Sequence, residues 1–259
     1  MRIVIKVGTT TLTHASGQLN IRRTEALCRI ISDIKNMGHE VILVSSGAIG
    51  MGVGKLSLKS RPTDIATKQA AAAVGQCELM YTYDKLFSEY HHTVAQMLLT
   101  GDDLGAADRH ENFKNTLQRL LQLGALPIIN ENDTVSTDEI KVGDNDTLSA
   151  MVAVSAHAQL LILLSDIDGL FTADPHTHPD AKLIPTVHSL DEDILSLAQD
   201  SASVLGTGGM KTKLTAARLC MDNGCDMIIA NGADPSILYH ILQDGDAVCT
   251  RFVAHAENA

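Results

Sequence analysis

Two lysines at opposite ends of the sequence lie beside glycine and hydroxyl residues, a combination that suits phosphate binding. Lys6 lies in the apolar run 3–7 and is followed by Gly8 and Thr9. Lys213 ends a segment that opens a predicted helix, Gly206-Thr207-Gly208-Gly209-Met210-Lys211-Thr212-Lys213. Backbone N–H groups and the helix dipole bind anions at such a helix start, and lysine adds a full charge. For Lys6 alone, a solvated strand position before an ordinary turn stays an open alternative.

Two dense polar clusters occur in the middle of the chain. The first, Asn130-Glu131-Asn132-Asp133, follows an apolar run, and the second, Asp144-Asn145-Asp146, opens a predicted helix. Short carboxylates and amides suit an ammonium ligand, whereas a helix N-terminus suits a carboxylate. Together the clusters predict a pocket for a zwitterion. The alternative for the second cluster is a helix cap, for which Asn145 or Asp146 would serve.

Two further segments follow predicted strands. The segment that begins at Ser45 and Ser46 contains glycines at positions 47, 50, 52 and 54, so its backbone could approach a ligand closely. A flexible loop is the open alternative, because the spacing fits neither a dinucleotide fingerprint nor a Walker loop. Ser165 and Asp166 follow a fully apolar run, and Asp166 at the strand end is a candidate for function.

The elements that must position these residues alternate between strand and helix. Strands are predicted at 3–7, 40–45, 94–99, 125–129, 159–164 and 227–230, and helices at 21–37, 63–87, 112–123, 146–156 and 211–223. Several strands are apolar on both faces, as in a parallel sheet covered by helices. We therefore expect an α/β fold, a three-layer αβα sandwich around a mostly parallel twisted sheet. In such sheets ligands bind beyond the carboxyl ends of the strands.

The composition narrows the class of protein. The chain has 259 residues without a linker-like segment, so we expect a single domain, 1–259. The formal net charge of −11 and the low aromatic content, 3% with no Trp, argue against nucleic acid or an anionic membrane as partner. Five scattered cysteines and the absence of a signal-like or spanning apolar run indicate a cytoplasmic protein.

These motifs resemble the amino acid kinase family over nearly the whole chain, from Lys6 to about Phe252. The specific matches are the runs Val142-Gly143-Asp144-Asn145-Asp146 and Gly206 to Lys213. Within the family, the match is to members that phosphorylate the side-chain carboxylate of L-glutamate with ATP and Mg²⁺. The resemblance implies formation of L-glutamate 5-phosphate, the first step of proline biosynthesis.

The resemblance also implies roles for individual residues. Lys6 and Lys213 would stabilise the transferring phosphoryl group, and Asp146 would orient both lysines. Residues expected at the glutamate are Ser46, Asp133, Asn145 and Asp144. Residues expected at the nucleotide are Lys6, Gly8, Thr9, Ser165, Asp166, Thr207, Gly208, Gly209, Met210, Lys211, Thr212 and Lys213. Gly47 would add a loop contact to phosphate, and no dedicated protein ligands for a metal are expected, since Mg²⁺ would arrive on the nucleotide.

Regulation and assembly are further expectations from the resemblance. L-proline is expected as an inhibitor, with Asp103, Asp133 and Glu139 as contributors to its site, and a homo-oligomer, dimer or tetramer, is expected. The chain differs from many family members in leaving no room for a C-terminal PUA domain, and Lys211 stands where a small polar residue is common.

Two alternatives to glutamate phosphorylation stay open from the sequence. One is a kinase of the same fold for another carboxylate or phosphate, although Asp133 and Asn145 suit a free α-amine. The other is a glutamate or proline sensor that has lost catalysis, against which both candidate lysines argue.

Overall fold

The computed structural model describes residues 1–14, 18–136, 145–175, 177–197 and 209–255. These residues form an eight-stranded sheet with the strand order β3-β4-β2-β1-β5-β7-β8-β6. Neighbouring strands are parallel except β7 and β8. The strands are β1 (Arg2–Val7), β2 (Glu40–Ser45), β3 (Val94–Leu99), β4 (Leu126–Glu131), β5 (Leu160–Ser165), β6 (Thr186–Val187), β7 (Asp226–Asn231) and β8 (Cys249–Phe252). The expected mostly parallel sheet is confirmed.

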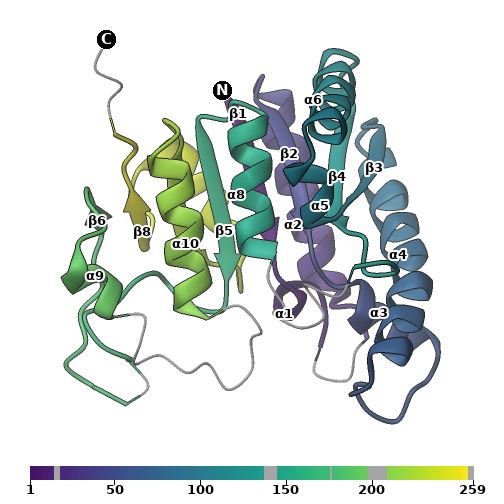
Figure 1. Cartoon of the computed structure of the whole chain (residues 1–259), viewed down its shortest axis with the longest axis horizontal. Coiled ribbons are helices and arrows are strands. Elements are labelled where there is room, and N and C mark those ends of the chain that lie inside the picture. The colour runs from purple at the N-terminus through teal and green to yellow at the C-terminus, as the bar shows by residue number, and fades with distance from the viewer. Residues whose placement is uncertain (15–17, 137–144, 176, 198–208, 256–259) are drawn as a thin grey trace.

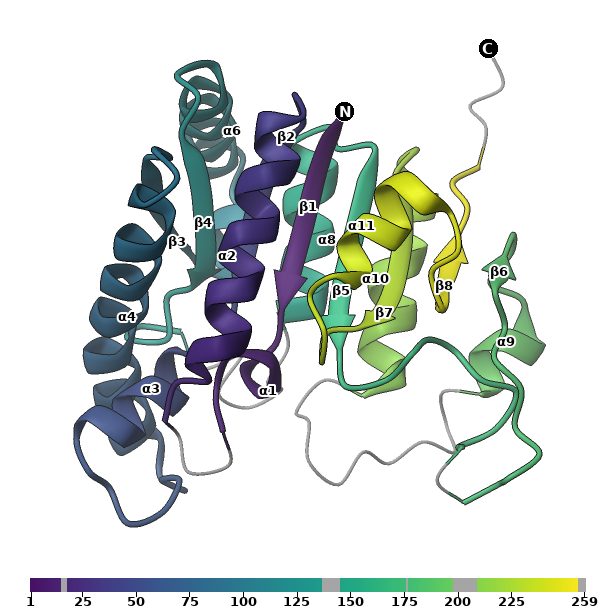
Figure 2. The same ribbon diagram turned by 180° about the vertical axis from the view of Figure 1, so that it is seen from behind.

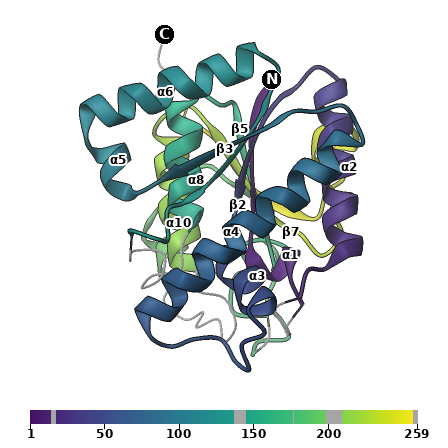
Figure 3. The ribbon, with the colours of Figure 1, turned by 90° about the vertical axis from the view of Figure 1, so that its right-hand side faces the viewer.

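Helices cover both faces of the sheet, which confirms the three-layer architecture. In Figure 1, α8 and α10 lie side by side in front of the sheet, and Figure 2, which is the view from the other side, shows α2 and α4 on the opposite face. The view in Figure 3 separates the two helical layers. The helices are α1 (Thr9–Leu12), α2 (Ile21–Asn36), α3 (Ala48–Lys55), α4 (Ile65–Ser88), α5 (Gly101–Gly105), α6 (Ala107–Gln122), α8 (Asn145–Ser155), α9 (Glu192–Ser196), α10 (Met210–Met221) and α11 (Ile237–Tyr239), which continues into the π-helical turn η1 (His240–Asp244).

Alternating side chains of the central strands fill two separate cores. In β1, Ile3 and Ile5 pack with the residues of α2 and α4, whereas Val4 packs with those of α6, α8 and α10. All three are fully buried, as expected for strands with apolar residues on both faces. Since side chains alternate along a strand, Lys6 faces the same side as Val4, toward α8 and α10.

The glycine-rich segment after β2 is a helix, so the flexible-loop alternative is wrong. Gly47 precedes α3 with φ of 111°, in the left-handed region that favours glycine. The glycines of α3 allow close packing on α4: a Cβ at Gly52 would lie 1.8 Å from the carbonyl oxygen of Ala71. A Cβ at Gly75 of α4 would likewise lie 1.7 Å from the carbonyl oxygen of Ala48. The glycines therefore serve a tight helix crossing at the end of β2.

Further differences from the sequence predictions are an earlier helix start and short elements that the sequence does not predict, such as strand β8. Helix α6 begins at Ala107, five residues before the predicted start at 112, because its first turn is polar and carries no apolar period. The sequence pattern does not predict strand β8, since it has four residues and only two of them are buried. No helix of the described residues combines the length and the apolar character that crossing a membrane requires.

Candidate active site

The topology brings the candidate residues to one edge of the sheet. Strand β1 lies between β2 and β5. Strands β2 to β4 lie on one side of β1, and the later strands lie on the other, so the strand order reverses at β1. In open α/β sheets, the carboxyl ends of the strands at such a reversal form the ligand crevice. Lys6 lies near the carboxyl end of β1, and Ser165 ends the neighbouring β5. The N-terminal ends of α8 and α10 lie at the same edge, at the bottom of Figure 1.

A buried carboxylate lies between the two candidate lysines. The Nζ atom of Lys6 is 2.6 Å from Oδ1 of Asp146, and the Nζ atom of Lys213 is 3.0 Å from Oδ2. Thr212 donates a further, longer hydrogen bond of 3.3 Å to the same Oδ2. The side chains of Lys6, Lys213 and Asp146 are 12%, 7% and 1% exposed. The structure therefore brings together all three residues predicted to be catalytic.

The charge of Asp146 is fixed by its two partners. Burial alone raises the pKa of this carboxyl, but the ammonium groups of Lys6 and Lys213 and their hydrogen bonds lower it to about 2. Asp146 is therefore ionised at neutral pH. Three groups with one negative and two positive charges leave a net positive centre, which suits an anionic ligand.

The predicted glutamate residues Ser46 and Asn145 are joined by a hydrogen bond. Nδ2 of Asn145 donates to Oγ of Ser46 at 2.8 Å and to Oδ1 of Asn130 at 3.0 Å. Asn145 is 1% exposed, and its Oδ1 has no hydrogen-bond partner among the described residues. Since Asn145 uses its amide nitrogen in this way and leaves its oxygen open, it does not cap α8. The open oxygen is a buried acceptor for a ligand's donor.

Asp133 supplies a second buried acceptor near the end of β4. It is 5% exposed, and its Oδ1 has no hydrogen-bond partner among the described residues. Burial, and then the charge of Glu131, raise the pKa of Asp133 to about 7. Glu131 is itself buried and accepts a short hydrogen bond from Ser136. A carboxylate in this situation gains from a cationic partner, as an ammonium group would provide.

Those remaining predicted nucleotide residues that the structure describes lie around the same edge. Gly8 and Thr9 begin α1 directly after β1. Oγ of Ser165 donates to Oδ1 of Asp166 at 3.1 Å, and Asp166 is exposed. Gly209, Met210, Lys211 and Thr212 lie at the start of α10, where Lys211 is exposed. Asp144, Thr207, Gly208 and Glu139 fall outside the described residues.

One residue of the buried network has no role that the sequence alone indicates. Asn130 belongs to the first polar cluster predicted to form the pocket, whereas Gln76 lies in an alanine-rich helix that gives no functional signal. Nδ2 of Asn130 donates to Oε1 of Gln76 at 2.9 Å. The available signal is a polar residue at a position that helical spacing places between buried neighbours, Ala72 and Leu79.

Asp103, expected to contribute to proline binding, is engaged in local structure. It forms a capping box with Thr100 at the start of α5 and lies 3.1 Å from Arg109. The hydrogen bond from the Thr100 side chain is the main cause that lowers the pKa of Asp103. The carboxylate is therefore ionised and paired.

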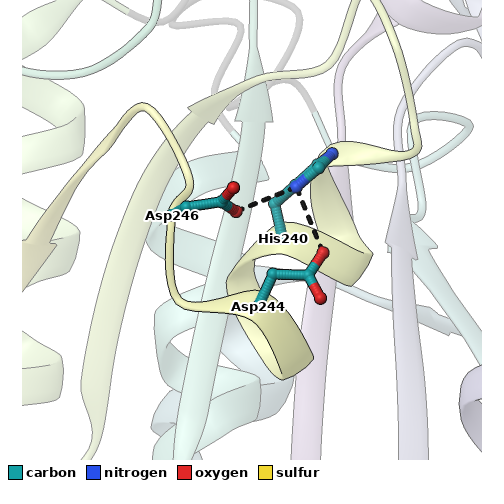
Figure 4. Close-up of side chains that lie close together, drawn as sticks. All are labelled: His240, Asp244 and Asp246. Atoms are coloured by element: carbon teal, nitrogen blue, oxygen red, sulfur yellow. Dashed lines mark hydrogen bonds and ion pairs between the residues drawn. The ribbon is translucent and has the colours of Figure 1, made fainter.

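A second polar cluster lies at the end of η1, outside this site. Nδ1 of His240 is 3.2 Å from Oδ2 of Asp244 and 2.9 Å from Oδ1 of Asp246 (Figure 4). Among the described residues, it is the one group of three side chains whose ligand atoms are close enough to hold a metal. Both carboxylates are exposed and bond the imidazole across Gly245, whose φ is 72°. The contacts explain the cluster as a chain reversal held by polar side-chain contacts.

Comparison with known proteins agrees with this fold. The model of the amino acid kinase family matches residues 1–231. The glutamate 5-kinase of Clostridium perfringens is 53% identical over 257 residues, which cover 98% of this chain and 95% of that protein. The glutamate 5-kinase of Symbiobacterium thermophilum is 53% identical over 251 residues, with 97% and 95% covered. A structure of carbamate kinase from Giardia lamblia, bound to AMP-PNP, shares the fold with a TM-score of 0.68 at 16% identity and 98% coverage of both chains. The chain therefore belongs to the amino acid kinase family.

Proposed function

We propose that the chain phosphorylates the side-chain carboxylate of L-glutamate with MgATP to give L-glutamate 5-phosphate and ADP. The observation that carries the proposal is the pair of lysine ammonium groups held by one buried carboxylate at the crevice. The glutamate 5-kinases that are 53% identical over almost the full chain support the choice of reaction. These relatives do not favour a different substrate, and the two lysines at Asp146 argue against a silent sensor.

The chemistry needs charge neutralisation more than proton transfer. An oxygen of the glutamate side-chain carboxylate attacks the γ-phosphorus of ATP, and the bond from that phosphorus to the bridging oxygen breaks as ADP leaves with the electron pair. The attacking carboxylate is already ionised at neutral pH, so the reaction requires no general base. Lys6 and Lys213 neutralise charge on the transferring oxygens, while Asp146 holds the two ammonium groups apart and oriented. Mg²⁺ enters as part of the nucleotide substrate and shields its phosphates.

The residues assigned to the substrate favour an acceptor with a free amino group. The unpartnered oxygens of Asn145 and Asp133 are two buried acceptors, which an ammonium group would satisfy. An N-acylated amine has one donor and no charge, so it would leave Asp133 uncompensated. This argument favours glutamate over an N-acetylated acid or carbamate.

The test is MgATP-dependent formation of a hydroxamate in the presence of hydroxylamine, which traps acyl phosphates. Glutamate, aspartate and N-acetylglutamate are compared as acceptors, and carbamate is followed by ADP release. Turnover with glutamate well above the others is expected. Turnover with another acid would retain the phosphoryl site and refute the substrate assignment. ATP binding without turnover of any acid would refute the proposal and favour a sensor.

L-proline is proposed as an inhibitor that competes with glutamate. Its secondary ammonium group could use the same open oxygens of Asp133 and Asn145. Inhibition that is overcome by glutamate but not by ATP is expected. Full activity in millimolar proline would refute this part of the proposal.

A homo-oligomer is proposed through the outward face of α4. Its exposed positions at helical spacing are apolar or small over four turns: Ala66, Ala70, Ala73, Cys77 and Tyr81. Ala73→Arg should then reduce the mass measured by light scattering to that of one chain. The Cys77 thiol should react slowly with a maleimide in the wild type and rapidly in the variant. An unchanged mass with a fast Cys77 reaction in both proteins would refute this interface.

We also propose that residues 1–259 act as one domain in the cytoplasm. Its N-terminal part would mainly serve glutamate and its C-terminal part the nucleotide. The proposal is supported by the use of ATP and by five free cysteines, three of them buried, which suit a reducing compartment.

A further inference from the structure

We infer that Gln76 of α4 is a positioning residue for substrate binding, which acts on Asn145 through Asn130. The three side chains form a buried chain of amides between helix α4 and the start of α8. Oε1 of Gln76 accepts from Nδ2 of Asn130 at 2.9 Å, and Oδ1 of Asn130 accepts from Nδ2 of Asn145 at 3.0 Å. Their exposed fractions are 9%, 2% and 1%. The inference rests on the proposed function, because it assigns a task at the glutamate site.

The donors and acceptors of the chain allow one orientation of Asn130. Its Oδ1 accepts from the backbone N–H of Glu131 at 2.9 Å as well as from Asn145. If the amide were turned over, its NH₂ group would face two donors, and buried donors need acceptors. The NH₂ group therefore points to Gln76, and among the described residues Oε1 of Gln76 is the acceptor that satisfies it.

The orientation of Asn145 follows from that of Asn130. Nδ2 of Asn145 donates to both Asn130 and Ser46, so its oxygen is turned away from both. This oxygen has no hydrogen-bond partner among the described residues, and it is the acceptor assigned to the substrate. Without an acceptor at position 76, the NH₂ group of Asn130 is buried and unsatisfied, while a turned-over amide would still face the two donors. Asn130 is then held less firmly, which loosens the hydrogen bond that keeps the nitrogen of Asn145 turned inward.

The position of Gln76 is fixed by the neighbouring glycine. Gly75 lies against the backbone of α3, where a Cβ would meet the carbonyl oxygen of Ala48 at 1.7 Å. Ala48 follows Ser46 by two residues, so the helix crossing holds Gln76 and the Ser46 turn in one rigid unit. A glutamine at this place is therefore held where its oxygen can orient the amides.

The decisive variants remove or retain the acceptor at position 76. Gln76→Met keeps the length of the side chain but removes both amide atoms, and Gln76→Glu keeps an oxygen facing Asn130. For Gln76→Met, KM for glutamate should rise about tenfold, while KM for ATP and kcat stay within about twofold. Gln76→Glu should restore KM to within about threefold of the wild type, because its protonated or ionised carboxyl still accepts.

A control glutamine, which is exposed, lies at the amino end of the central strands, opposite the site. Oε1 of Gln159 accepts from the backbone nitrogen of Arg2 at 2.7 Å, so Gln159→Met also removes a glutamine acceptor. This control should leave KM for glutamate unchanged even where it lowers the melting temperature. The inference is overturned if Gln76→Met leaves that KM unchanged, if the control raises it equally, or if Gln76→Glu is no better than Gln76→Met.

A double-mutant cycle tests whether Gln76 acts through Asn145. In an Asn145→Ala background, Gln76→Met should raise KM for glutamate by less than about twofold, because the oriented group is already absent. Independent tenfold effects would overturn the inference. Failure of the proposed function is separate, since the wild type itself would then form no hydroxamate with glutamate.

Discussion

The buried carboxyl of Asp133 should make glutamate binding depend on pH close to neutrality. Burial and the neighbouring charge of Glu131 raise its pKa to about 7 in the free protein. The ionised form is the one that binds an ammonium group, and binding in turn favours ionisation. We therefore expect glutamate binding to change as the pH is raised from 6 to 8. The variant Asp133→Asn has no ionisable group at this position and should not show the change.

The size of the effect follows from the fraction of protein that is ready to bind. With a pKa of about 7, about one molecule in eleven has Asp133 ionised at pH 6 and about ten in eleven at pH 8. The apparent KM for glutamate should therefore fall about tenfold between these values. The side-chain carboxylate of glutamate stays ionised over this range, so it does not contribute to the change.

Two measurements test whether ionisation of Asp133 causes the change of KM with pH. The first is KM for glutamate at saturating MgATP, by the hydroxamate assay, at half-unit steps of pH. The second is calorimetric titration with glutamate at pH 6 in two buffers of different ionisation enthalpy, which should show release of about 0.9 proton per site. Asp133→Asn should bind more weakly at every pH, with a KM that stays flat from pH 6 to 8.

The raised pKa of Asp133 also makes the stability of the free protein depend on pH. Since the folded pKa of Asp133 lies above its ordinary value of 3.8, the unfolded chain releases this proton first. Asp133 therefore stabilises the fold most below pH 4 and loses that contribution as the pH rises toward 7. A wild type with flat KM and no proton release would refute the reasoning, as would an unchanged pH profile in Asp133→Asn.

Other predictions concern the phosphoryl site and the helix crossing. Lys213→Ala should abolish phosphoryl transfer with the circular dichroism spectrum intact, and a kcat near that of the wild type would refute its role. Asp146→Asn leaves two buried ammonium groups without their counter-charge. It should lower kcat and should lower the free energy of unfolding, measured in urea, by about 3–5 kcal/mol. A loss of stability below about 1 kcal/mol would contradict the ion-pair assignment. Gly75→Ala would place a methyl group 1.7 Å from the carbonyl oxygen of Ala48, so the melting temperature should fall by several degrees. The control is Gly105→Ala, whose Cβ meets no atom within 4 Å.

The fold and the phosphoryl half of the site follow largely from local signals. Strands such as β5, which is apolar up to its last residue, Ser165, and amphipathic helices such as α2 have patterns that the sequence shows directly. The pairing of Lys6 with Lys213 is predictable from the sequence because both fall at the carboxyl edge of a parallel sheet. Their shared contact with Asp146 agrees with that expectation.

The substrate half is only partly predictable, for a physical reason. The roles of Gln76 and Asn130 depend on which amide atom faces which neighbour across 54 residues of sequence. No local pattern encodes such a contact. Helix α3 escapes prediction similarly, because glycine disfavours a helix by about 1 kcal/mol per residue and only the tertiary contact with α4 reverses this preference. In both cases long-range packing, absent from any short window, decides the structure.

The two halves of the site are supported by different helices, and this separation bears on how substrate choice is encoded. Lys6, Asp146 and Lys213 are held by β1, α8 and α10, whereas the amide chain is anchored in α4 through Gln76. The carbamate kinase structure has the same fold at 16% identity, so the fold by itself leaves the acceptor open. Substitutions along α4 should therefore change KM for the acceptor while leaving the handling of ATP intact. Substitutions at the start of α10 should instead change the handling of ATP while leaving KM for the acceptor intact. Asn145 and Asp146 are adjacent at the start of α8, so this one turn of helix couples the acceptor to the phosphoryl group.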